Sequence, residues 1–506
     1  MLRSSLILVV LALLALLFAD LEVTTLSAWS ELGEIALGAV QPDFSVLWKF
    51  KSAFLNTVIF AFAGTSLAAF WGGVLALGFG WAPVRLLCAF IRSVHEIFWA
   101  FIFLNLVGLN PICGVLSIAI PYSGIFAKVY AEIAQESDRR PLVGIPPRAD
   151  GFSSFIYAVL PVVYTDAKLY TGYRFECALR SSTILGFIGL PTIGYHLETA
   201  FREGIYNHAW ALLYAFYLLI AALKYWARPK LIIPYIVISF TFLSQKISIS
   251  WANMIRFLTV DIMPWPLRRV DPISGNQEIN FSVTEILSWL INTWHDAGAE
   301  GVWNTILLTQ IVLATTGIFT LLAFPFACRN LSYRPIKPIT RFLLIVCRTT
   351  PEYILAYVFI LIYGPSMLPA ILAITLHNGA ILSFLTSNNA DLIKLRSDAP
   401  KRHFDRYTYL VLPRVYGQFL AFLFYRWEII MRESAILGIL GIYTLGFYID
   451  SAIAEDQLDN AILLILITAT LNIIIDSISQ QVRKRLKIST RFVVASNQIF
   501  STQGQD

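Results

Sequence analysis

A repeat of about 250 residues constrains this 506-residue chain more than any other feature. The segment Tyr173-Arg174-Phe175-Glu176 returns as Tyr425-Arg426-Trp427-Glu428, 425 − 173 = 252 positions later. At the same offset, the Arg-x-Ser-x-Ile-Leu-Gly run that begins at Arg180 returns at Arg432. Self-similarity of this kind indicates two copies of one structural unit. Repeats fused within a membrane usually form a transport route along the axis between them.

The composition indicates a membrane protein, because 57% of the residues are hydrophobic, 14% are charged and the mean hydropathy is +0.67. We expect the lipid bilayer, and no nucleic acid, as a partner. The five cysteines stand singly in apolar stretches and suit packing. The six histidines show no ligand spacing, so the sequence predicts neither a metal site nor catalytic residues. It also lacks the G-x-x-x-x-G-K-[ST] phosphate loop, so ATP would have to be bound by another polypeptide.

Apolar windows of about 17 to 25 residues are long enough to cross a bilayer as helices. The sequence therefore predicts an all-α polytopic membrane protein with about twelve transmembrane helices in two parallel repeats. The first of these windows also resembles a signal peptide, but Ala19-Asp20-Leu21 suits cleavage poorly, so we expect it to remain. The windows are 4–19, 53–79, 85–108, 112–134, 164–190, 209–224, 231–248, 303–327, 339–363, 366–388, 416–445 and 459–476.

The charges in the loops predict that both termini are cytoplasmic. With the N-terminus inside, basic segments such as 224–230, 329–337 and 483–485 lie on the cytoplasmic side, as expected for bacterial inner-membrane proteins. We expect a first repeat at 1–224, a cytoplasmic linker at 225–230, a second repeat at 231–488 with an outer loop at 249–301, and a polar cytoplasmic tail at 489–506. Within the outer loop, residues 281–294 have the apolar spacing of an interfacial helix.

Ionisable residues inside the predicted spans come in matching pairs, and a charge at membrane depth is costly unless it is paired or faces water. Each pair is four residues apart, so we expect both members on one helix face. They act either as structural ion pairs or as groups in the substrate pathway. The first-half pairs are Arg92 with Glu96 and Glu176 with Arg180, and the second-half pairs are Arg348 with Glu352 and Glu428 with Arg432.

The arginines of the repeated block are the main candidates for the substrate pathway. Arg174 and Arg426 lie two residues from the glutamates of their block and need other partners. Together with Arg180 and Arg432, they are expected to attract an oxyanion, because guanidinium groups make planar bidentate hydrogen bonds to such ligands. Glu433 has no acidic counterpart in the first half, where Ser181 occupies its position.

A cytoplasmic stretch in each half ends in Leu-Pro, at Leu160-Pro161 and at Leu412-Pro413. With the Arg-x-x-x-x-Leu-Gly runs, these stretches resemble the inner-membrane permease subunit of a binding-protein-dependent ABC importer of the phosphonate type, in two fused copies. The chain departs from that family where Arg148 and Pro400 replace a glycine 13 residues before the proline, and where Phe384 stands at the position of Glu132. Because proline interrupts helical hydrogen bonding, we expect the chain to turn back into the membrane there.

The resemblance implies that these stretches couple the permease to two copies of a cytoplasmic ABC ATPase, which would bind ATP-Mg. It also implies a periplasmic or extracellular substrate-binding protein that delivers a phosphonate, phosphite or phosphate-like oxyanion. An ion-gradient-driven anion transporter or channel is the first alternative, and a membrane scaffold or sensor that does not transport is the second. The chain itself is expected to be no enzyme and to carry no cofactor.

Overall fold

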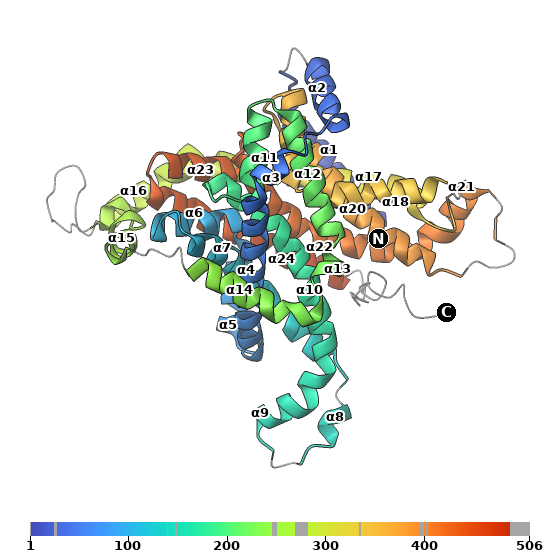
Figure 1. Cartoon of the computed structure of the whole chain (residues 1–506), viewed down its shortest axis with the longest axis horizontal. Helices are drawn as coiled ribbons and strands as arrows, with labels where there is room; N and C mark the ends of the chain where they lie inside the picture. The colour runs from blue at the N-terminus through green and yellow to red at the C-terminus, as the bar shows by residue number, and fades with distance from the viewer. Residues whose placement is uncertain are drawn as a thin grey trace. The chain divides into compact units, whose positions relative to one another are not determined.

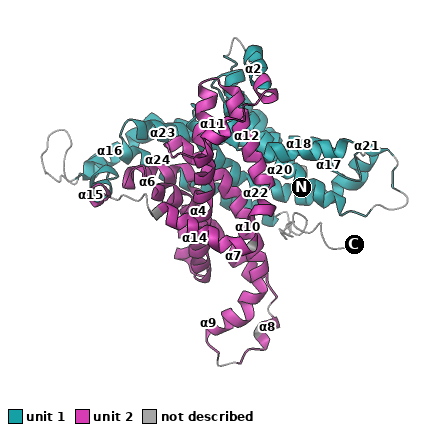
Figure 2. Cartoon of the chain, in the orientation of Figure 1, with its two compact units in different colours: residues 1–36, 255–490 teal, residues 37–254, 491–506 magenta. Residues whose placement is uncertain are grey.

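The computed structural model describes residues 2–24, 28–138, 140–146, 149–244, 250–268, 282–332, 335–394, 399–400 and 402–485. All the regular secondary structure in these residues is helical (Figure 1), which confirms the predicted all-α class. The chain divides into two compact units, coloured separately in Figure 2. Unit 1 comprises residues 1–36 and 255–490, and unit 2 comprises residues 37–254 and 491–506.

Unit 2 holds most of the first sequence repeat. Its α-helices are α3 (Val46–Lys49), α4 (Lys51–Leu77), α5 (Ala82–Ser93), α6 (Glu96–Val107), α7 (Pro111–Glu136), α8 (Arg140–Val143), α9 (Gly151–Ser154), α10 (Leu160–Ile184), α11 (Ile193–Arg202), α12 (Tyr206–Ala221), α13 (Leu223–Trp226) and α14 (Ile232–Ser244). Short π or 3-10 turns are η1 (Phe155–Val159), η2 (Leu185–Ile188) and η3 (Pro229–Leu231).

Unit 1 holds most of the second repeat. Two helices cross its boundary with unit 2, α2 (Ala28–Val40) and α15 (Trp251–Arg256). Its other α-helices are α1 (Leu2–Leu16), α16 (Val283–Thr293), α17 (Ala299–Ala327), α18 (Ile336–Thr349), α19 (Glu352–Tyr363), α20 (Met367–Asp391), α21 (His403–Asp405), α22 (Leu412–Gly438), α23 (Leu445–Ala454) and α24 (Leu458–Arg485). Its turns are η4 (Phe257–Asp261), η5 (Trp265–Leu267), η6 (Trp294–Gly298) and η7 (Arg406–Val411).

Each predicted apolar window overlaps a helix, but the predicted count of twelve spans is not reached in the described residues. Five helices are long and apolar enough to cross a membrane, namely α4, the continuous 283–327 helix, α7, α20 and α24, and three bent pairs raise the number to eight. The windows 85–108 and 339–363 are each split into two helices, which meet at 91° and 95°. A continuous apolar window therefore concealed a sharp bend in each half.

The helix ends follow from local residues. Asn110 caps α7, because its side-chain oxygen accepts a hydrogen bond from the Ile112 amide, and Pro111 suits the first turn. Gly108 and Gly364 end α6 and α19 with φ values of 77° and 87°, a conformation that glycine adopts without a steric penalty. The corresponding helices of the two halves therefore end in the same way.

The first helix of each sequence repeat packs with the other repeat. Helix α1 lies in unit 1 against α17, where the hydroxyl groups of Ser5 and Tyr416 are 2.6 Å apart. Helix α14, which opens the second repeat, lies in unit 2 against α4, with the rings of Phe62 and Tyr235 5.3 Å apart. The compact units therefore do not coincide with the boundaries of the sequence repeats.

The outer loop 249–301 contains more helix than loop. Its described residues form α15, α16 and the short turns around them, before α17 begins. Helix α16 confirms the predicted helix across residues 283–293 and exposes Leu287 and Ile291, whereas Trp289 is buried. Residues 269–281 of this loop and the predicted tail at 489–506 lie outside the described residues.

Candidate substrate pathway and coupling segments

The repeated Arg-x-Ser-x-Ile-Leu-Gly block ends at a tight helix contact in both halves. A side chain on Gly186 would collide with the Tyr195 amide of α11, and one on Gly438 would collide with the Phe447 amide of α23. Glycine is required at both positions because the two backbones touch. The block thus fixes the end of α10 or α22 against the next helix.

A second contact fixes the same corner. The Thr57 hydroxyl of α4 accepts a hydrogen bond of 3.0 Å from the Ile193 amide, which opens α11. In the second half, the Thr305 hydroxyl of α17 accepts one of 3.0 Å from the Leu445 amide, which opens α23. Each hydroxyl satisfies an amide at a helix start that has no partner within its own helix. The two repeats therefore share this detail as well as the motif.

Arg174 is surrounded by phenols in unit 2. Its Nε donates a 2.8 Å hydrogen bond to the hydroxyl group of Tyr170, and its guanidinium lies 5.6 Å from the centre of that ring and 5.4 Å from the ring of Tyr122. The hydroxyl group of Tyr122 lies 3.0 Å from the Oγ atom of Ser181. In the described residues these polar partners are all neutral, so the positive charge is stabilised by ring faces and oxygen dipoles.

The positions that correspond to Arg174, Tyr122 and Ser181 carry different side chains in unit 1. From α5 to α7 the repeat offset is 256, as between Glu96 and Glu352, so Asn378 corresponds to Tyr122. The same offset pairs Glu132 with Asn388, which corrects the expected pairing with Phe384. Arg426 donates a 3.2 Å hydrogen bond from Nη1 to Oδ1 of Asn378. Asn378 donates in turn from Nδ2 to Oε2 of Glu433 at 2.5 Å. Hydrogen bonds thus connect Arg426 to Asn378 and Asn378 to Glu433. This series ends in a carboxylate, whereas the first half has Ser181 at the position of Glu433.

The other members of the repeated block lie on the same two helices. Glu176 and Arg180 are partly buried on α10, and the Nη2 atom of Arg180 lies 3.5 Å from Sγ of Cys177. On α22, Glu428 is buried and Arg432 is partly buried. Each of these pairs does share one continuous helix, as their spacing predicted.

For the other two pairs the expectation of one helix face is wrong. Arg92 lies near the end of α5 and Glu96 begins α6, across the 91° bend. Arg348 lies near the end of α18 and Glu352 begins α19, across the 95° bend. The helical hydrogen bonding breaks between the partners, so the spacing of four residues no longer sets their geometry. Arg92, Glu96 and Glu352 are buried, and the guanidinium of Arg348 lies 4.5 Å from the ring centre of Phe384.

The two stretches that the resemblance implies as coupling segments, residues 132–161 and 394–413, connect long helices: α7 with α10 in unit 2, and α20 with α22 in unit 1. Glu132 is exposed on α7, Pro400 is partly buried before α21, and Arg148 lies outside the described residues. In the first segment, Arg140 donates to the carboxylate of Asp138 from Nε at 2.7 Å, which lowers the pKa of that exposed carboxyl group. Within unit 2, α8 and α9 lie beyond the end of α10 (Figure 1).

The chain does not turn back at either proline, which corrects the expectation from the sequence. Leu160 and Pro161 open α10 directly after the π-helical turn η1, and Leu412 and Pro413 open α22 directly after η7. A π turn hydrogen-bonds five residues back, so the backbone accommodates the missing amide hydrogen of proline while the helical direction continues.

An aromatic side chain is exposed at the same place in both segments. Tyr157 in η1 and Tyr409 in η7 are 79% and 80% exposed, and 409 − 157 = 252. The sequence interpretation did not single out these tyrosines, although their offset was already visible. Large exposed aromatic groups are typical of protein contact surfaces.

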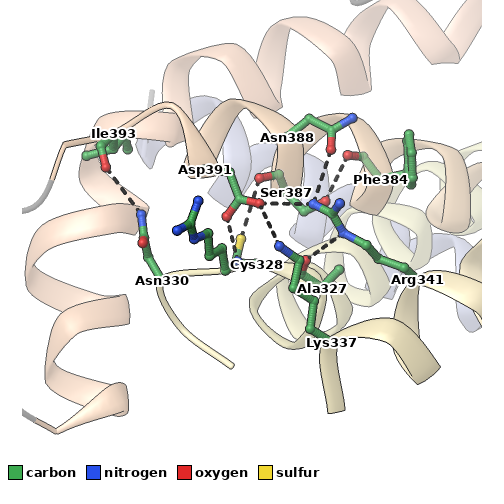
Figure 3. Close-up of polar contacts among 11 residues, drawn as sticks. Ala327, Cys328, Asn330, Lys337, Arg341, Phe384, Ser387, Asn388, Asp391 and Ile393 are labelled. Atoms are coloured by element: carbon green, nitrogen blue, oxygen red, sulfur yellow. Dashed lines mark hydrogen bonds and ion pairs between the residues drawn. The ribbon is translucent and has the colours of Figure 1, made fainter. Parts of the chain in front are cut away.

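In unit 1, an ionic cluster (Figure 3) holds the helix ends together. The Asp391 carboxylate at the end of α20 accepts from the Arg329 amide at 2.6 Å, from Nη2 of Arg341 at 3.0 Å and from Nζ of Lys337 at 3.4 Å. Arg406 of η7 donates to the Asn330 carbonyl at 2.9 Å, which ties the second coupling segment to the same place.

The corresponding place in unit 2 is open. Gln135 occupies the position of Asp391, and Arg85 donates to the carbonyl groups of Phe79 and Gly80 in its own turn. A cavity of about 270 Å³ is found there. It is lined by residues from α4, α7 and the coupling segment, among them Phe79, Gln135 and Val159. The two coupling segments therefore rest on different supports.

Comparison with known proteins identifies the family. Residues 317–488 match the protein family described as "Binding-protein-dependent transport system inner membrane component". The chain is 24% identical over 463 residues to the phosphate-import permease protein PhnE of Mycolicibacterium smegmatis, covering 85% of each chain. It is 30% identical over 204 residues to the phosphite transport system permease protein PtxC of Stutzerimonas stutzeri, covering 38% of this chain and 73% of that one.

A third relative is the putative cryptic phosphonate transport system permease protein PhnE2 of Escherichia coli, 32% identical over 102 residues, which are 20% of this chain and 82% of that one. No solved structure matches the chain. The match to the Mycolicibacterium smegmatis permease spans 85% of both chains and so includes parts of both repeats, as expected for two fused copies. The chain belongs to the family of binding-protein-dependent transport system inner membrane components.

Proposed function

We propose that this permease imports a tetrahedral phosphorus oxyanion, namely a phosphonate, phosphite or phosphate, in an ATP-driven complex. The observation that carries the proposal is the site of Arg174, a guanidinium whose polar contact in the described residues is the phenol of Tyr170. A cation held by neutral groups keeps its charge available for an anion. The names of the relatives support the same substrate class, because they are described as phosphate, phosphite and phosphonate permeases.

The complex would contain two copies of an ABC ATPase that bind ATP-Mg, and a binding protein at the outer face. In this proposal the exposed Tyr157 and Tyr409 contact the ATPases, since they lie at matching positions before the Leu-Pro pairs. ATP-driven closure of the two ATPases would move the coupling segments and switch the pathway from outward-open to inward-open. Both termini would be cytoplasmic, as the loop charges predict.

Reconstitution tests the proposal. Labelled phosphate, phosphite or methylphosphonate is added to the solution outside proteoliposomes that contain the full chain. The ATPase and the binding protein are each added or omitted. We expect uptake that requires ATP and both partners. Uptake without either partner would instead establish the gradient-driven transporter or channel. Binding of the partners without uptake of any of the three anions would establish the scaffold.

Variants connect uptake to the site. Arg174→Gln removes the charge while keeping a polar side chain, and we expect it to abolish most of the uptake. Arg202→Gln is the matched control, because Arg202 is exposed and its ion pair with Glu198 has a length of 2.9 Å on the surface of α11. Equal loss of uptake in both variants would contradict a specific role for Arg174.

A further inference from the structure

Three buried side chains with metal-binding atoms meet inside unit 1. They come from three helices, with Glu352 at the start of α19, His377 in α20 and Glu433 in α22. Their exposed fractions are 9%, 2% and 9%. One donor atom from each lies within 4.8 Å of the others, and Nε2 of His377 is 4.0 Å from Oε2 of Glu352. This convergence is independent of the proposed function.

The hydrogen bonding of His377 fixes the tautomer of its ring, and with it which nitrogen presents a lone pair to the glutamates. Nδ1 lies 3.0 Å from the carbonyl oxygen of Thr350, and a carbonyl can only accept. Nδ1 therefore carries the hydrogen atom, and in the neutral ring Nε2 is an electron-pair donor. An imidazole nitrogen and two carboxylates thus point toward one small volume, and a cation among them would be attracted by all three.

We propose that Glu352, His377 and Glu433 bind one divalent transition-metal ion. A nitrogen ligand with two carboxylates suits zinc, manganese or ferrous iron, whereas calcium and magnesium prefer oxygen ligands alone. Zinc lies about 2.0 to 2.2 Å from such ligands, so tetrahedral neighbours are about 3.4 Å apart. The 4.0 Å between His377 and Glu352 then has to close by about 0.6 Å, which small side-chain rotations supply.

Hydrogen bonds from neighbouring residues orient the proposed ligands, as such bonds do for the ligands of known metal sites. The Thr350 carbonyl fixes the tautomer of His377, and Nδ2 of Asn378 holds Oε2 of Glu433 at 2.5 Å. Asn378 is itself fixed by Arg426. The ion would therefore link three helices next to the arginine of the repeated block.

The first repeat supplies an internal comparison. The residues at the three equivalent positions are Glu96, Pro121 and Ser181, so one ligand of three remains. In the described residues, no second group of this kind is found. We therefore expect one metal ion per chain, bound by the second half.

Metal content tests the proposal directly. The full chain is purified in detergent, incubated with zinc ions, passed through a desalting column and measured by inductively coupled plasma mass spectrometry. We expect about one zinc per wild-type chain, and at least a fivefold loss in His377→Ala and Glu433→Gln. The control Glu96→Gln changes the first-half counterpart of Glu352 and is expected to keep its zinc. Zinc content in wild type no higher than in His377→Ala would overturn the proposal.

A measurement on the wild-type chain remains decisive if the variants fail to fold. X-ray absorption at the zinc edge is expected to show one imidazole nitrogen together with oxygen ligands. A spectrum with no imidazole contribution, or no bound zinc in a monodisperse sample, would overturn the site and favour a shared proton. Because neither measurement uses transport, failure of uptake and failure of metal binding are distinguishable.

Discussion

Arg426 donates a 3.2 Å hydrogen bond to Asn378, and this contact marks where the two halves of the permease differ chemically. The first-half counterpart of Asn378 is Tyr122, whose ring lies 5.4 Å from the guanidinium of Arg174. The positions are equivalent, but among the described residues Asn378 hydrogen-bonds to the carboxylate of Glu433, whereas the hydroxyl group of Tyr122 lies 3.0 Å from that of Ser181. A phosphorus oxyanion is therefore expected to depend more on Arg174 than on Arg426.

Substitution of the two arginines tests this inequality. Arg174→Gln is expected to lower the kcat/KM of uptake by about 10-fold to 100-fold, since a charged hydrogen bond contributes about 1.5 to 3 kcal/mol. Arg426→Gln is expected to have a smaller effect, because the second series already contains an amide and a carboxylate. Concentration-dependent uptake in proteoliposomes measures both, and a larger effect for Arg426→Gln would reverse the assignment.

The glycine contacts predict a loss of stability. Gly186→Ala and Gly438→Ala each force a side chain into the backbone of the next helix, and we expect about 1 to 3 kcal/mol of destabilisation from such overpacking. Gly172→Ala is the control, because no atom of a neighbouring element lies near its added carbon and alanine favours a helix. Thermal unfolding in detergent compares them. Equal melting temperatures for Gly172→Ala and Gly186→Ala would show that the corner tolerates movement.

The threonine contacts predict a matched pair of effects. Thr57→Val and Thr305→Val keep the shape of the side chain but leave the Ile193 or Leu445 amide without its acceptor, at a cost of about 1 to 3 kcal/mol. Thr470→Val serves as control, because its exposed hydroxyl bonds only to a carbonyl of its own helix. Hydrogen exchange at the starts of α11 and α23 is expected to accelerate in the first two variants. Unchanged exchange there would contradict the role of the hydroxyl groups.

The exposed tyrosines predict a defect in coupling rather than in folding. Tyr157→Ala and Tyr409→Ala are each expected to weaken ATPase binding by about 2 kcal/mol, or about 30-fold, as for an aromatic residue central to an interface. Tyr164→Ala, which alters an exposed tyrosine on α10 itself, provides the comparison. Surface plasmon resonance with the purified ATPase measures the affinities. Wild-type affinity in both coupling variants would place the contact elsewhere.

The sequence predicted the features that repeat. The 252-residue offset correctly paired the two Arg-x-Ser-x-Ile-Leu-Gly blocks, whose final glycines, Gly186 and Gly438, make the same close backbone contact in both halves. Apolar windows also gave the positions of the helices. These signals are local or periodic, so they survive without knowledge of the tertiary structure.

The bends were harder to predict. The 95° bend had a signal in Pro351, which disfavours helix at the residue before it, but the first half has His95 at that position and bends by 91° all the same. The meeting of Glu352, His377 and Glu433 had no local signal, because the residues are 25 and 56 positions apart on three helices. The sequence prediction of no metal site relied on short spacings, and packing brings distant residues together.

The exchange of first helices has a consequence for biosynthesis. Helix α1 ends at Leu16 and its neighbour α17 begins at Ala299, so 299 − 16 − 1 = 282 residues are made between them. At roughly 5 to 20 residues per second, α1 waits on the order of 15 to 60 s for the helix it packs against. During that time α1 is without α17, and the apolar side chains that make up most of it favour its staying in the bilayer. Helix α1 therefore remains in the bilayer until the ribosome has made α17, the helix against which it packs.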